Sequence, residues 1–116
     1  MHFKQWFENL TCFSVSVNRL YGWRYKVLEA IQEVQAGQLS YTEGPLTVSR
    51  LDSPRGSFFV MDGHHRLIQE ILAGKKMISV NINEFVPRIE RTGGSHREMV
   101  AQKVLIAQAV LSSVPR

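Results

Sequence analysis

The sequence predicts a mixed α/β domain of the α+β kind, in which a small mixed sheet packs with three helices in the order β-α-β-β-α-β-α. Three observations lead to this fold class. A chain of 116 residues with 44% apolar and 21% charged residues has the composition of one folded domain. Strict alternation of apolar and polar residues indicates strands, and apolar residues recurring every three to four positions indicate helices. Glycine-containing turns separate these segments.

The first half of the chain shows a strand, a helix and two further strands. Residues 12–18 alternate between apolar and polar side chains, as in a half-buried strand. Residues 24–36 carry an apolar stripe at helical spacing and stop at Gly37, which predicts an amphipathic helix. Residues 45–51 and 57–61 have the pattern of strands, and the short turn between them predicts a hairpin.

The second half shows a helix, a strand and a final helix. Residues 64–73 carry one apolar stripe and end at Gly74, which predicts a short helix. Residues 77–85 alternate again and predict a strand. After a basic loop at residues 88–94, one-sided apolar spacing predicts a helix over residues 95–112.

We take residues 12–116 as a single domain and residues 1–11 as an N-terminal extension. Amphipathic terminal helices usually complete a core, so we expect the C-terminal helix to pack on the sheet. The alternative is that this helix forms a homodimer contact.

Composition limits the classes of function. No apolar run approaches the roughly 18 residues of a membrane span, and the first residues show no signal-peptide core, so we expect no membrane association. Cys12 is the only cysteine, which excludes an intrachain disulfide and a cysteine-based zinc site and favours the reducing cytoplasm. The net charge of +4 permits a polyanionic partner without requiring one.

The segment Asp62-Gly63-His64-His65-Arg66, here called the 62–66 turn, concentrates polar groups between a buried strand and a helix. The first N–H groups of a helix lack intrahelical partners, and the helix dipole is positive there. Gly63 lets a ligand approach the backbone, while the two histidines and Arg66 supply donors for phosphate. These features predict that Gly63, His64, His65 and Arg66 bind a phosphate or nucleotide.

Asp62 has three open roles: it can hold Mg²⁺, accept a proton from a hydroxyl group, or simply cap the helix. Asp62 and His65 are the candidate catalytic residues. The alternative is that Asp62-Gly63 forms an ordinary turn before a helix whose histidines face solvent. Zinc is disfavoured, because adjacent histidines point in different directions on a helix.

A second glycine-rich turn at residues 92–98 precedes the last predicted helix, and a Ser-x-x-Glu capping box explains it structurally. The functional alternative is that Arg91, His96 and Arg97 fold over a nucleotide or a nucleic-acid backbone. Trp23, between the first strand and the first helix, is either packed or stacked on a nucleobase. Trp23, Arg91, His96 and Arg97 are therefore accessory site candidates.

Two quoted segments resemble the core of the ParB/sulfiredoxin-like superfamily, in the form of its ParB-like nuclease domains: Phe59-Val60-Met61-Asp62-Gly63-His64-His65-Arg66-Leu67 and Leu72-Ala73-Gly74-Lys75-Lys76-Met77-Ile78-Ser79-Val80. Members carry a Gly-x-[His/Arg]-Arg turn that opens a helix, which ends in glycine before a strand. The resemblance covers residues 12–86. It implies a ParB/sulfiredoxin-like fold that binds ATP, ADP or CTP with the triphosphate against this turn. With such a nucleotide, Asp62 would hold Mg²⁺ or act as the base.

Departures from family patterns narrow what the resemblance implies. Sulfiredoxins have a cysteine where His64 stands, and Cys12 lies in a distant strand, so we do not expect sulfinic-acid reduction. Partition-type ParB proteins use Gly-Glu-Arg-Arg and add a helix-turn-helix domain, for which the chain after residue 86 is too short. The Asp-Gly-His-His-Arg form looks closer to free serine kinases of this fold and to small ParB-like nucleases. In those kinases a glutamate near the first helix serves as base; Glu29 and Glu33 lie in that helix without matching a motif.

Three functions remain open from the sequence. The first is a nucleotide-binding enzyme that transfers a phosphoryl group or hydrolyses the nucleotide. The second is a DNA-binding or nuclease module acting on a phosphodiester backbone, although Asp62 has no evident acidic partner for a nuclease metal and the positive charge is modest. The third is a non-catalytic accessory domain. Because fold analogy does not decide function, the sequence leaves open whether the protein is an enzyme.

Overall fold

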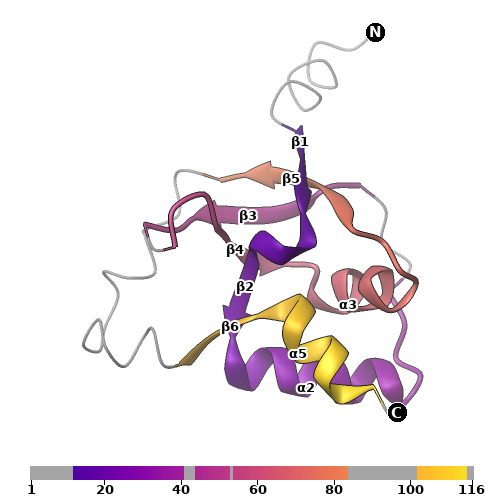
Figure 1. Ribbon diagram of the computed structural model, residues 1–116. Helices are drawn as coiled ribbons and strands as arrows, with labels where there is room; N and C mark the ends of the chain where they lie inside the picture. The colour runs from indigo at the N-terminus through magenta and orange to yellow at the C-terminus, as the bar shows by residue number, and fades with distance from the viewer. Residues whose placement is uncertain (1–11, 41–43, 53, 84–101, 115–116) are drawn as a thin grey trace, which may run out of the picture.

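The structure is a computed structural model that describes residues 12–40, 44–52, 54–83 and 102–114. In these residues a six-stranded mixed sheet has the order β1-β5-β3-β4-β2-β6, and three α-helices lie together on one of its faces (Figure 1). The elements are β1 (Cys12–Ser16), the 3₁₀ helix η1 (Val17–Arg19), β2 (Leu20–Trp23), α2 (Arg24–Gln35), β3 (Leu46–Arg50), β4 (Phe58–Asp62), α3 (His64–Leu72), β5 (Met77–Ile82), β6 (Lys103–Leu105) and α5 (Ile106–Ser113).

The mixed sheet with three helices confirms the predicted fold class. Helices α2 and α3 lie where expected, and β3 and β4 form the predicted antiparallel hairpin. The sheet is mixed because β3 also pairs parallel with β5, and β4 pairs parallel with β2. This arrangement places β4 inside the sheet, so its last residues lead directly from the core into the start of α3.

Strand β2 was not expected, because Gly22 breaks its apolar pattern. A Cβ atom at Gly22 would lie 2.9 Å from Cγ2 of Val27 and 3.3 Å from Cδ1 of Ile106. Glycine in a strand often marks such a close approach of neighbouring elements. The missing side chain therefore allows α2 and α5 to pack tightly against β2.

The helix predicted over residues 95–112 is wrong at residues 103–105. Residues 103–105 form β6, which pairs antiparallel with β2 through Gly22↔Val104 and Trp23↔Lys103, and α5 begins only at Ile106. Pairing with β2 overrides the local helical spacing, since tertiary context decides between weak propensities. The predicted capping box and the basic loop at residues 88–94 lie outside the described residues.

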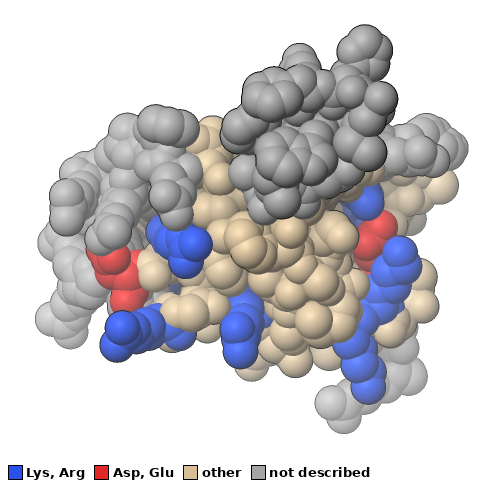
Figure 2. Space-filling model, turned by 90° about the horizontal axis from the view of Figure 1, so that it is seen from above, with Lys and Arg blue, Asp and Glu red and all other residues tan. Residues whose placement is uncertain are grey.

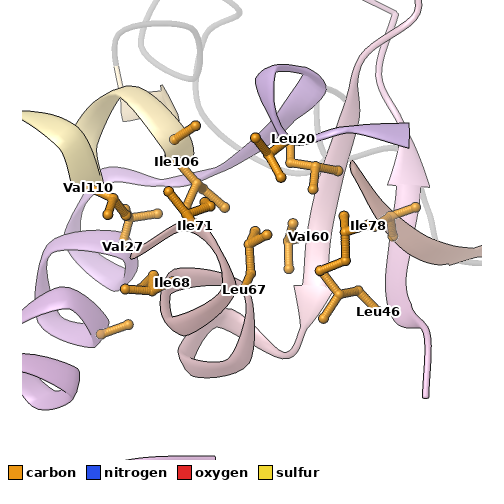
Figure 3. Packing of buried hydrophobic residues seen from close by; sticks show 14 of the residues in the cluster. Leu20, Val27, Leu46, Val60, Leu67, Ile68, Ile71, Ile78, Ile106 and Val110 are labelled. Carbon is orange, nitrogen blue, oxygen red and sulfur yellow. The ribbon is translucent and has the colours of Figure 1, made fainter. Parts of the chain in front are cut away.

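The core lies between the sheet and the helices. Leu67 and Ile68 of α3 and Val60 of β4 are completely buried. Figure 3 shows Ile106 and Val110 of α5 directed toward the side chains of α2 and α3. The C-terminal helix thus completes the core as expected, while the homodimer contact stays a prediction. None of the described helices has the length and apolar character that a membrane crossing requires.

Candidate nucleotide-binding site

The 62–66 turn depends on the backbone geometry of Gly63. Gly63 is the N-cap of α3 and has a φ of 95°, in the left-handed region that side chains disfavour. A Cβ atom there would lie 2.5 Å from Cδ2 of Leu46. Both the conformation and the contact with β3 therefore require glycine at this position.

The start of α3 has no side-chain cap. Asp62 is exposed, and its Oδ1 accepts a hydrogen bond of 2.9 Å from the N–H of Gly63, whereas the N-cap position belongs to Gly63 itself. Of the three open roles of Asp62, the N-cap is thus wrong, because Gly63 occupies that position. Because no side chain satisfies the first turn, the N–H groups of residues 64–66 remain available to an anion.

A cleft of about 480 Å³ opens beside the turn. Its size falls in the range of small-molecule sites. All five residues of the 62–66 turn line it, together with residues from α2, from β3 and the segment before it, and from β4. Those further residues are Lys26, Glu29, Ala30, Glu33, Ser40, Pro45, Leu46, Thr47 and Met61.

His65 forms a pair with Glu33 of α2. Its Nε2 lies 3.2 Å from Oε2 of Glu33, and both side chains are about one-third exposed (38% and 30%). In the neutral imidazole, a proton on Nε2 satisfies this contact and leaves the lone pair on Nδ1. We assign this tautomer from the hydrogen bond. The pair has the form of a base oriented by a carboxylate.

His64, the preceding residue, has a different environment. Its Nε2 is buried without a hydrogen-bond partner in the described residues and lies close to Gly22 at the β2–α2 junction. Burial lowers the pKa of His64 below its ordinary value of 6.5; the charges of Lys26 and His65 lower it further, and Asp62 raises it. His64 is therefore neutral at pH 7 and brings no charge to the cleft.

Arg66 forms an ion pair with Glu70, which lies one helical turn further along α3. Its Nε donates to Oε1 of Glu70 at 3.4 Å, and Nζ of Lys75 lies 3.8 Å from the same oxygen. This contact with Glu70 is made by Nε and does not involve the two terminal nitrogens of the guanidinium group. Those nitrogens form the fork that binds phosphate in two parallel hydrogen bonds.

The opposite wall of the cleft comes from α2. Lys26, Glu29 and Glu33 recur at helical spacing and face the cleft, while Val27 and Val34 of the same helix are buried. The cleft therefore contains cations for phosphate and carboxylates for a metal or a proton. Among the described residues, no group of three His, Cys, Asp or Glu side chains is placed to hold a metal ion. Asp62 nevertheless suits Mg²⁺, which binds proteins through one or two carboxylates and otherwise uses water and phosphate oxygens.

Of the accessory candidates, the structure describes Trp23. Trp23 does not line the cleft; its ring meets Phe59 edge-on, with centroids 5.3 Å apart, so packing accounts for it. Arg91, His96 and Arg97 lie outside the described residues. Cys12 pairs with Asn81 at the β1 edge of the sheet and does not line the cleft.

Sequence reasoning missed Lys26 and left Glu33 unassigned. The signal in the sequence was a set of charged residues on α2. They recur three and four positions apart, on the side of the helix opposite its apolar stripe. That face is also typical of a solvated helix, so the pattern alone does not indicate a site. Only the packing of α2 beside the start of α3 turns it into a wall of the cleft.

No protein-family model matches the chain, and no curated protein matches it. Two solved structures are similar. One is a conserved hypothetical protein from Pyrococcus furiosus, with 14% identity and a TM-score of 0.44 over 66% of this chain; the chain spans about a third (33%) of that protein's length. The other is sulfiredoxin from Arabidopsis thaliana, with 15% identity and a TM-score of 0.41, covering 78% of this chain and 94% of the sulfiredoxin. Because both TM-scores lie below 0.5, we base the function on this chain's own residues.

Proposed function

We propose that the cleft binds the phosphates of a nucleotide, namely ATP, ADP or CTP, and that the protein transfers a phosphoryl group from it or hydrolyses it. One observation carries this proposal: the whole 62–66 turn lines a single cleft at the uncapped start of α3. Free N–H groups, the positive end of the helix dipole and the fork of Arg66 converge there. This is the combination that phosphate groups require.

The acid–base groups needed for phosphoryl transfer lie in the same cleft. His65, oriented by Glu33, can accept a proton from an attacking hydroxyl group or water through Nδ1. Asp62 would hold Mg²⁺, which supplies charge neutralisation on the phosphate oxygens when bound. Positioning and electrostatic stabilisation account for most catalysis of this kind, so a small cleft suffices.

A phosphodiester backbone is the alternative occupant, which would make the protein a DNA-binding or nuclease module. The nuclease form is favoured less, because among the described residues no three His, Cys, Asp or Glu side chains are grouped to hold a metal ion, whereas nucleases normally use acids that converge on a metal. Figure 2 shows the Lys and Arg side chains of one face in separate groups rather than in one continuous stripe. Nucleic-acid binders typically present a clustered basic surface.

Calorimetric titration with ATP, ADP and CTP, with and without Mg²⁺, tests the proposal. We expect saturable binding of at least one nucleotide, weakened about tenfold or more in Arg66→Ala, because a charge-assisted contact to phosphate is lost. Lys76→Ala is the matched control, since Lys76 is an exposed cation outside the cleft and binding should not change.

Absence of binding at about 1 mM of every nucleotide would contradict the proposal. A gel shift or nicking of plasmid DNA by the same preparation, lost in Arg66→Ala, would instead support the phosphodiester alternative. An equal loss of nucleotide binding in Lys76→Ala would show that the attraction is general and does not come from the cleft.

A further inference from the structure

Nδ1 of His65 has no hydrogen-bond partner among the residues that the structure describes. The ring makes its hydrogen bond through Nε2, which lies 3.2 Å from Oε2 of Glu33, so Nε2 carries the proton in the neutral imidazole. The lone pair of Nδ1 is therefore free, in a side chain that is 38% exposed and lines the cleft. Such a lone pair can attack phosphorus as well as accept a proton.

Glu33 orients this nucleophile from a second helix. The carboxylate comes from α2 and the imidazole from the first turn of α3, and the two helices pack against each other. Val34 of α2 and Leu67 of α3 are buried close to the pair in sequence, so the backbone at both ends of the contact is fixed. A carboxylate on Nε2 also stabilises the positive charge that the ring gains when Nδ1 forms a bond.

The pair stands beside the proposed phosphate site. His65 follows Gly63 by two residues, in the turn whose N–H groups have no side-chain cap, and Arg66 is the next residue. A phosphate at these N–H groups is therefore close to the turn from which His65 projects. Cys12, the only cysteine of the chain, does not line the cleft, so a thiolate is not the nucleophile there.

We propose that a bound nucleoside triphosphate phosphorylates His65 on Nδ1, which makes phosphohistidine a covalent intermediate. The inference rests on the proposed function and specifies its first step. The Nδ1 lone pair forms a bond to the terminal phosphorus while the bond from that phosphorus to the bridging oxygen breaks. The nucleoside diphosphate leaves with the electron pair of the broken bond, and the proton on Nε2 stays between the ring and Glu33.

A second displacement regenerates the histidine. Water or an acceptor hydroxyl group attacks the same phosphorus, the N–P bond breaks, and its electron pair returns to Nδ1. In these steps Asp62, rather than His65, accepts the proton of the attacking group, because its carboxylate is exposed in the same cleft. The products are inorganic phosphate or the phosphorylated acceptor.

Incubation of the full chain with Mg²⁺ and ATP labelled in its terminal phosphate, followed by quenching in alkali, tests the proposal. We expect a label that is stable in alkali and lost in mild acid, as a phosphoramidate is, and that mass spectrometry assigns to His65. ATP labelled in its α-phosphate should leave no label. Glu33→Gln should slow the labelling about 100-fold, whereas Lys76→Gln, at an exposed position outside the cleft, should label normally. Circular dichroism confirms that each variant is folded.

Stereochemistry covers the case in which the intermediate does not accumulate. Each in-line displacement inverts the configuration at phosphorus, so two displacements through His65 give net retention when the terminal phosphate is made chiral with oxygen isotopes and sulfur. Net inversion would overturn the proposal, because it requires one direct transfer to water or to the acceptor.

Calorimetric titration of the same preparation separates this inference from the proposed function. ATP binding without label and without turnover, or a label that maps to another residue or survives acid, would overturn the phosphohistidine and leave the nucleotide site intact. Absence of ATP binding would overturn both proposals.

Discussion

Neighbouring histidines in the 62–66 turn have opposite surroundings. His64 buries its Nε2 near Gly22 without a partner, whereas His65 reaches across to Glu33. Successive residues on a helix point about 100° apart, so one ring enters the packing between β2 and α3 while the other enters the cleft. At the scale of single residues, the two histidines therefore differ: His64 is neutral and packed, and His65 is the candidate base.

Protonation of His64 should make stability depend on pH. Its pKa is lowered in the folded state, first by burial and then by the charges of Lys26 and His65. The unfolded chain therefore binds a proton more readily, and stability rises with pH in this range. We expect the stabilisation to be complete above pH 6.5 and to be lost as the pH falls from 6.5 through the lowered folded-state value. Urea unfolding of the wild type and His64→Gln between pH 5 and 7.5 measures this, since the variant should show a shallower dependence.

Replacement of Glu33 should affect turnover more than binding. In Glu33→Gln the carboxylate that orients His65 is lost, so we expect the rate of phosphoryl transfer or hydrolysis to fall about 100-fold while the nucleotide Kd changes no more than about twofold. Lys76→Gln, a substitution of an exposed charged residue outside the cleft, is the control and should retain the wild-type rate. A loss of affinity without a change in rate would assign Glu33 to binding.

At the scale of elements, sequence patterns identified the segments that carry their own periodicity. Helix α3 has a complete apolar stripe and glycines at both ends, and β3 and β4 are joined by a short turn. Strands β2 and β6 are short and pair with each other, so neither has a strong local signal. Long-range pairing of this kind is decided by the packed sheet, where context overrides propensity.

Gly22 is the residue that joins these elements. Gly22→Ala should lower the free energy of unfolding by about 1–3 kcal/mol, because the new Cβ would crowd Val27 and Ile106. Pairing it with Val27→Ala relieves part of the crowding, so the double variant should lose less than the sum of the two single variants. Denaturant unfolding of the four proteins gives this coupling, and strict additivity would contradict the contact.

The candidate site was predictable where it is continuous in sequence. Residues 62–66 are five neighbours, and their types alone indicate phosphate chemistry at the start of a helix. Glu33 and Lys26 are about thirty residues or more away from them and reach the cleft only through the packing of α2. Trp23 shows the opposite case, since its chemistry suits a nucleobase but its position in β2 places it against Phe59.

At the scale of the whole molecule, α2 separates two surfaces. One face of the helix completes a cleft of mixed charge at the 62–66 turn, and another packs beside the uncharged helix α5. The net charge of the whole chain is +4, but the cleft itself combines cations with carboxylates.

The central claim is that nucleotide phosphates bind at the uncapped start of α3, and amide NMR during titration of the full chain with ATP and Mg²⁺ tests it most directly. We predict that the amides of Gly63, His64, His65 and Arg66 shift first and most, and that they shift in the same sense with inorganic phosphate at higher concentration. Shifts that leave these four amides unchanged, or that appear only in α5, which does not line the cleft, would contradict the account.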